Sequence, residues 1–155
     1  MVLYFAYGSN MLLSQIGKRL KNPDLSPCCV VYAEDRTLIF PRKSDKQKGG
    51  VASIEEKKDD KVFGAVFEIT DEELKKLDSF EGYKKGCKNN RYEHREIELK
   101  KEDGTIIRAI TYVANKKGIY LPSQYYMNKI IRGATECKLP ETYIQKLKRI
   151  KTKVD

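Results

Sequence analysis

The chain has 155 residues, of which 40% are hydrophobic and 34% charged, and it contains four cysteines and a single histidine. This length fits one domain, residues 1–155, with a core large enough to fold without disulfides, and the composition is that of a globular rather than a disordered protein. No apolar run approaches the roughly 20 residues that a membrane-spanning helix needs, so we expect no membrane partner.

The formal net charge is +9, which is compatible with an acidic partner such as a nucleic acid. However, the lysines are mixed with acidic residues, as in residues 55–61, which we expect to form a solvated hairpin tip. No run of Lys and Arg is interleaved with aromatic residues, the pattern of single-strand binders. A basic nucleic-acid-binding protein is therefore the weakest of the functions considered.

The cysteines do not form a recognisable disulfide or metal-binding pattern. Cys28 and Cys29 are adjacent, Cys87 and Cys137 stand alone, and none lies at a Cys-x-x-Cys spacing or near His94 in a zinc-type arrangement. We expect four reduced thiols, a cytoplasmic location and no bound metal.

The first half of the chain predicts one helix among several strands. Residues 2–7 are apolar and predict a buried strand, which Gly8–Asn10 end with a turn. Apolar residues at helical spacing follow in residues 12–20. Further strands are expected at residues 28–34, 37–41, 51–55 and 62–69, with a flexible basic loop at 43–50.

The second half begins with a helix whose ends are marked in the sequence. Thr70 and Glu73 have the spacing of a capping box, and Gly82 is suited to the position after a helix that ends near Glu81. Strands at 92–99 and 105–114 flank an Asp-Gly turn, and helices are expected from Ser123 to 136 and from 140 to about 150. This order predicts an α+β fold around a mixed, largely antiparallel sheet or small barrel.

Glu81 is the first candidate for acid–base chemistry. It lies four and seven residues after Leu77 and Leu74, so it shares their apolar helix face and is expected to point toward the core. Burial and the negative end of the helix dipole both raise a carboxyl pKa toward the value a general acid/base needs. The alternative is an ordinary glutamate turned to water, and the pattern leaves both open. Glu68, on a strand face with Val62 and Val66, is the second candidate.

The Tyr7-Gly8-Ser9-Asn10 loop is the second candidate site. A strand, a glycine turn and a helix start present free backbone N–H groups, which suit a carboxylate or an oxyanion. The alternative is a plain turn in which Ser9 or Asn10 caps the helix. Ser9 is disfavoured as a hydrolase nucleophile because Gly-x-Ser-x-Gly is absent and His94 is the sole imidazole.

Two tyrosines are the third group of candidates. Tyr92 opens a strand, and Tyr126 shares a helix face with Ile130 and Ala134. Each hydroxyl could hold a substrate group at a pocket edge, while simple core packing is the alternative for both rings.

Three segments in this order carry a resemblance that spans nearly the whole chain. Tyr-Phe-Ala-Tyr-Gly-Ser-Asn at 4–10, Phe-Gly-Ala-Val-Phe at 63–67 and Leu-Asp-Ser-Phe-Glu-Gly-Tyr at 77–83 resemble the γ-glutamylcyclotransferase (AIG2-like) superfamily. Tyr92, Pro-Ser-Gln-Tyr-Tyr at 122–126 and Gly-Ala at 133–134 look like its γ-glutamylcyclotransferase branch. Residues 86–91 make the spacer between Glu81 and Tyr92 longer than is usual for the family.

The resemblance implies a small mixed β-barrel with flanking helices and a cofactor-free enzyme. Such an enzyme would convert a small γ-glutamyl amine or γ-glutamyl amino acid to 5-oxoproline and release the free amine. The resemblance assigns Glu81 as acid/base, Tyr7, Gly8, Ser9 and Asn10 as the substrate loop, and Tyr92 and Tyr126 as tyrosines near the pocket. A binding module on the same fold that lacks turnover is the main alternative, and oligomeric state stays open.

Overall fold

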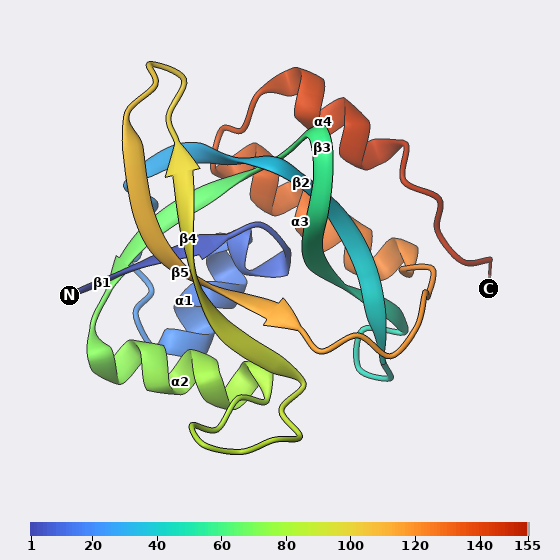
Figure 1. Ribbon diagram of the computed structural model, residues 1–155, viewed down its shortest axis with the longest axis horizontal. Coiled ribbons are helices and arrows are strands. Elements are labelled where there is room, and N and C mark those ends of the chain that lie inside the picture. Colours follow the sequence, from blue (N-terminus) through green and yellow to red (C-terminus); the bar gives the residue numbers. More distant parts are fainter. Residues whose placement is uncertain (155) are drawn as a thin grey trace.

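In a computed structural model, residues 1–154 are described, and within them five strands close into a barrel in the order β1-β3-β2-β4-β5 (Figure 1). The strands are β1 (Val2–Ala6), β2 (Cys29–Ser44), β3 (Gly49–Ile69), β4 (Tyr92–Lys100) and β5 (Ile106–Ala114). All neighbours pair antiparallel except β1 and β5, which run parallel where Tyr4 faces Ile110. The expected α+β fold with a mixed, largely antiparallel barrel is confirmed.

The helices lie outside this barrel. They are the 3-10 helix η1 (Ser9–Met11), α1 (Leu13–Leu20), α2 (Asp71–Glu81), α3 (Gln124–Glu136) and α4 (Glu141–Lys148). Contacts join α1 to α2 and α3 to α4, and Figure 1 shows these two pairs on different sides of the barrel. No helix of the described residues has the length and apolar character needed to cross a bilayer.

The longest hairpin corrects the expected strand boundaries. β2 and β3 pair from Cys29 opposite Val66 to Ser44 opposite Gly49, so the hairpin tip is at residues 45–48. The four strands expected from residue 28 to 69 are thus two, and residues 43–50 are strand ends and a tight turn rather than a flexible loop. A tip at 55–61 was wrong for a physical reason: a charged run fits a strand equally well when its side chains reach water, and a register shift after Glu34 accommodates it.

The local signals in the second half are confirmed. Thr70 Oγ1 accepts from the Glu73 N–H at 3.0 Å, the Glu73 carboxylate accepts from the Thr70 N–H at 2.9 Å, and α2 ends at Glu81. Gly82 follows with φ of 68°, a conformation that costs glycine little. Ser123 Oγ caps α3 by accepting from the N–H of residue 126 at 3.0 Å.

In the core, the barrel strand β1 packs against the helices. Phe5, Phe67 and Ile16 are fully buried there, from β1, β3 and α1. α3 approaches η1 so closely that a Cβ at Gly133 would lie 2.5 Å from the Leu12 nitrogen. This packing fixes the end of β1 and the turn after it, where the candidate site lies.

Candidate active site

A cavity of about 170 Å³ opens where the end of β1, the tip of the β2–β3 hairpin, the end of α2 and the starts of β4 and α3 meet. Its volume is below the roughly 300–1,000 Å³ of typical drug-sized ligand sites, so it has room for a small ligand or for part of a larger one. The residues predicted from the sequence all line it, namely Tyr7, Gly8, Ser9, Asn10, Glu81, Tyr92 and Tyr126.

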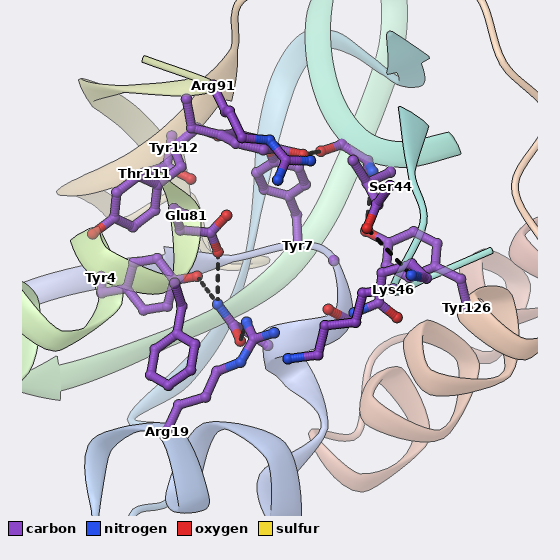
Figure 2. A pocket seen from close by; sticks show the side chains of 18 residues that line it. Tyr4, Tyr7, Arg19, Ser44, Lys46, Glu81, Arg91, Thr111, Tyr112 and Tyr126 are labelled. Atoms are coloured by element: carbon purple, nitrogen blue, oxygen red, sulfur yellow. Dashed lines mark hydrogen bonds between the residues drawn. The ribbon is translucent and has the colours of Figure 1, made fainter. Parts of the chain in front are cut away.

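Asn10 joins the loop to Glu81 through a hydrogen bond, which a dashed line at the Glu81 carboxylate marks in Figure 2. Its buried Nδ2 group donates to Glu81 Oε1 at 3.1 Å and to the Tyr4 hydroxyl at 3.0 Å. Its Oδ1 accepts from Arg19 Nη1 at 2.9 Å and from Gln15 Nε2 at 3.1 Å. Four partners therefore fix the orientation of this one amide, with its donor side toward the carboxylate.

The environment of Glu81 favours its protonated form. Burial of the carboxyl group raises its pKa, and the nearby Asp78 carboxylate raises it further. The Arg19 charge, the hydrogen bond from Asn10 and the Arg91 charge partly oppose this rise. The residue as a whole is only half-buried, so the carboxyl group is shielded by its neighbours yet reachable from the cavity. The sequence left open whether the Glu81 side chain points toward the core or out to water, and the structure supports the first alternative.

The loop does not serve as an ordinary helix cap. The N-cap positions are Gly8 for η1 and Leu12 for α1, and neither makes a side-chain cap bond, while the N–H of Leu13 donates to Glu136 on α3. Ser9 Oγ accepts from Gln15 Nε2 at 2.9 Å, and Asn10 donates to Glu81. The hydrogen bonds found among residues 1–154 include none donated by the backbone N–H groups of Gly8, Ser9 or Asn10. These groups are thus available to an anionic or carbonyl oxygen in the cavity.

Three of the tyrosine hydroxyls at the cavity already donate to the protein. Tyr7 donates to the carbonyl of residue 112, Tyr92 donates to the Ala52 carbonyl at 2.9 Å, and Tyr112 donates to Asp78. Toward a ligand, the predicted site residue Tyr92 can therefore act as an acceptor only, while its hydroxyl proton ties β4 to β3.

The other two tyrosines keep a hydrogen to donate. The Tyr4 hydroxyl accepts from Asn10, and the Tyr126 hydroxyl accepts from the Ala52 N–H at 3.0 Å. Burial raises the pKa of both phenols, that of Tyr126 to about 12, so both stay protonated. Because a hydroxyl is donor and acceptor at once, each can still donate to a ligand.

The sole histidine lies behind the cavity rather than in it. His94 bonds Asp78, which also accepts from Tyr112, and the Tyr83 ring stacks on the imidazole with centroids 4.0 Å apart. Since Ser9 bonds Gln15 instead of an imidazole, the structure offers no Ser–His pair there. The four cysteines are free thiols.

Sequence reasoning missed several lining residues. Arg19 had a usable signal, because it lies one turn after Gln15 on a polar helix face. Tyr4 also had a usable signal in the sequence, because a tyrosine in a buried strand needs a hydrogen-bond partner for its hydroxyl. Lys46 and Arg91 lie in turns and carry no periodic signal. Glu68, the second acid candidate, is exposed and lies outside the cavity.

Comparison with known proteins gives a consistent result. Residues 61–147 match the model of the AIG2-like family. The chain is 36% identical over 152 residues to the gamma-glutamylcyclotransferase of Mus musculus and 35% identical to that of Homo sapiens, covering 96% of this chain and 78% of each relative. A solved structure named gamma-glutamyl cyclotransferase superimposes with a TM-score of 0.89 at 33% identity, covering 99% of this chain and 90% of the other.

Proposed function

Because the chain belongs to the AIG2-like family of γ-glutamylcyclotransferases, we propose that this enzyme converts a γ-glutamyl amine or γ-glutamyl amino acid to 5-oxoproline and the free amine, with Glu81 as general acid/base. The observation that supports this most is the Glu81 carboxyl group itself. It has a raised pKa, accepts a hydrogen bond from Asn10 and faces a small cavity rich in neutral donors.

The reaction needs one proton shuttle. The α-ammonium of the substrate gives a proton to Glu81, and the free amine attacks the γ-carbonyl carbon. A C–N bond forms in a five-membered ring, and the original amide C–N bond breaks as Glu81 returns the proton to the departing nitrogen. The attacking nitrogen then gives up its second proton through the same carboxylate, so the product is a neutral lactam and the amine leaves as an ammonium ion. A pKa above that of a solvated glutamate suits both steps, because the same group must accept and then donate.

The cavity also contributes to catalysis by holding the substrate in the reactive geometry. Holding the γ-glutamyl chain folded makes use of effective molarity, which reaches about 10⁵ M in well-oriented systems. The N–H groups of Gly8, Ser9 and Asn10 and the hydroxyls of Tyr4 and Tyr126 can hold the substrate carboxylate and the oxyanion. One such donor to an oxyanion is worth about 3–4 kcal/mol.

The test is a screen of γ-glutamyl compounds for release of 5-oxoproline, with Glu81→Gln compared against wild type. We expect kcat to fall by about 10²–10⁴ because the variant keeps the shape and removes the proton shuttle. Glu68→Gln is the matched control, since Glu68 is exposed and outside the cavity. Melting temperatures on the same samples show that loss of activity is not loss of fold.

Two results would count against this proposal. Retention of more than about a tenth of wild-type kcat by Glu81→Gln contradicts the role of Glu81, because general acid–base catalysis contributes about 10²–10⁴. Binding of γ-glutamyl compounds without any 5-oxoproline release would indicate a binding module.

A further inference from the structure

The cavity carries more positive than negative charge. Among the described residues, its lining includes three cationic side chains, Arg19, Lys46 and Arg91, and one carboxylate, that of Glu81. Arg19 is occupied, because it donates to Asn10 at 2.9 Å and its guanidinium lies 5.0 Å over the Phe80 ring. The side chains of Arg91 and Lys46 have no hydrogen bond or ion pair within residues 1–154.

Arg91 is held beside Glu81 by the segment between α2 and β4. Its N–H donates to the Gly82 carbonyl at 3.2 Å, and its carbonyl accepts from the Asn115 N–H at 2.9 Å. Its side chain runs over Gly82, where a Cβ would lie 3.2 Å from Arg91 Cδ. The buried Asn90 clamps the same segment, accepting from the Lys84 N–H at 3.0 Å and donating to the Lys84 carbonyl at 2.9 Å.

Lys46 comes from a separate fixed element, the tip of the β2–β3 hairpin. The neighbouring Gln47 is buried, its carbonyl accepts from Ser123 Oγ at 2.6 Å, and its Oε1 accepts from Lys129 Nζ at 2.9 Å. Figure 2 shows Arg91 and Lys46 on different sides of the cavity, with Glu81 near the Tyr4 side. The two unpaired cations thus come from two anchored turns.

Burial separates the two ends of the cavity. Tyr4, Asn10 and Tyr126 are each 4% exposed, whereas Arg91 and Lys46 are exposed residues. The cations therefore lie at the mouth, and the neutral donors lie at the closed end. In the proposed reaction both the attacking amine and the amide that breaks must reach Glu81, so the remainder of the released amine extends toward the mouth.

We propose that Arg91, assisted by Lys46, binds a carboxylate on the amine that is released. Arg91 is then the residue that distinguishes a γ-glutamyl amino acid or short peptide from a γ-glutamyl amine, which has no such carboxylate. A guanidinium is suited to this role because it can donate two parallel hydrogen bonds to one carboxylate. This inference rests on the proposed function for turnover, but its binding step can be tested separately.

The experiment compares two substrates that differ by one carboxylate, γ-glutamyl-alanine and γ-glutamyl-ethylamine. The readout is the ratio of their kcat/KM values, from 5-oxoproline release, in wild type, Arg91→Gln and Arg91→Lys. We expect wild type to prefer γ-glutamyl-alanine by about tenfold or more, Arg91→Gln to lower that ratio about tenfold, and Arg91→Lys to restore part of it. Arg149→Gln is the control, because Arg149, directly after α4, is exposed and lies outside the cavity.

An unchanged ratio in a folded Arg91→Gln overturns the inference. If kcat/KM falls equally for both compounds, Arg91 binds the glutamyl α-carboxylate instead. If wild type turns over neither compound, the proposed function fails, and calorimetric binding of the same two compounds decides the inference alone. Tighter binding of γ-glutamyl-alanine that Arg91→Gln abolishes supports it, while equal affinities or no binding of either compound overturn it.

Discussion

At the scale of single residues, Asn10 and Glu81 determine the chemical character of the site. The Asn10 amide donates to Glu81 because Arg19 and Gln15 occupy its carbonyl oxygen. A hydrogen bond to the ionised form lowers a carboxyl pKa, and burial raises it, with burial the larger effect at Glu81. The result is a carboxyl group that exchanges its proton more readily near neutral pH than a solvated one.

The pH dependence of activity follows from that balance. The raised pKa of Glu81 predicts that the acidic limb of kcat/KM has its midpoint above the ordinary glutamate value of about 4.3. The measurement is kcat/KM for one γ-glutamyl substrate across the acid range. A midpoint at 4.3 would mean that the carboxyl group behaves as a solvated one.

The same pKa predicts how stability depends on pH. Between the unfolded and the higher folded pKa the folded state binds more protons, so the free energy of unfolding falls as pH rises through this window. Glu81→Gln removes this cost, and it should therefore stabilise the protein relative to wild type more at pH 8 than at pH 4. Denaturant unfolding of both proteins at the two pH values checks the sign.

At the scale of elements, α2 is the part of the fold that positions Glu81. Its start is fixed by the capping box of Thr70 and Glu73. Its last turn is tied to the barrel because the Asp78 carboxylate accepts from His94 on β4 and Tyr112 on β5. Since Asp78 lies three residues before Glu81, these bonds constrain the turn that carries the acid/base candidate.

Tyr112→Phe tests that tie. It keeps the ring and removes the hydroxyl that donates to Asp78, so we expect destabilisation of about 1–3 kcal/mol. At about 2–4 °C per kcal/mol for a chain of this size, the melting temperature should fall by several degrees. We also expect kcat to fall more than KM changes, because the position of Glu81 is affected. Tyr120→Phe is the matched control, because Tyr120 is half-buried and lies outside the cavity. Equal melting temperatures for the two variants would argue against the tie.

At the scale of the whole molecule, charge favours an anionic ligand. The net charge is +9, and unpaired cations lie at the cavity mouth. A field of one sign raises the local concentration of oppositely charged ligands and weakens as salt shortens its range. Under the proposed function, the charge that first suggested a nucleic-acid partner serves to attract a small anionic substrate.

The salt dependence of kcat/KM tests whether the positive charge attracts an anionic substrate. γ-Glutamyl-alanine carries one net negative charge at neutral pH, and γ-glutamyl-ethylamine carries none. Raising KCl from about 0.01 to 0.15 M shortens the Debye length from about 30 to 8 Å, so kcat/KM should fall by at least about twofold for the first compound and stay nearly constant for the second. Parallel slopes for the two compounds would contradict electrostatic attraction.

Features that depend on neighbouring residues were determined by the sequence alone. The capping box, the end of α2 at Glu81 and the Asp-Gly hairpin between β4 and β5 each rest on contacts within a few residues, so composition and spacing predict them. The motif at residues 4–10 likewise marked the loop that lines the cavity.

Only the tertiary structure decided the strand register, the hydrogen bonds of the site residues and the set of residues that line the cavity, because all three depend on closure of the barrel. The β2–β3 pairing overrides a charged run that also suits a turn, because strand pairing and not local charge sets the register. Arg19 and Gln15 on α1 bind the Asn10 carbonyl oxygen and thereby turn its NH2 group toward Glu81. Carbonyl groups on distant strands likewise decide which tyrosine hydroxyls are already used as donors. Arg91 and Lys46 reach one cavity from turns 45 residues apart in sequence. No local pattern encodes such convergence, because it exists only once the strands have closed around the site.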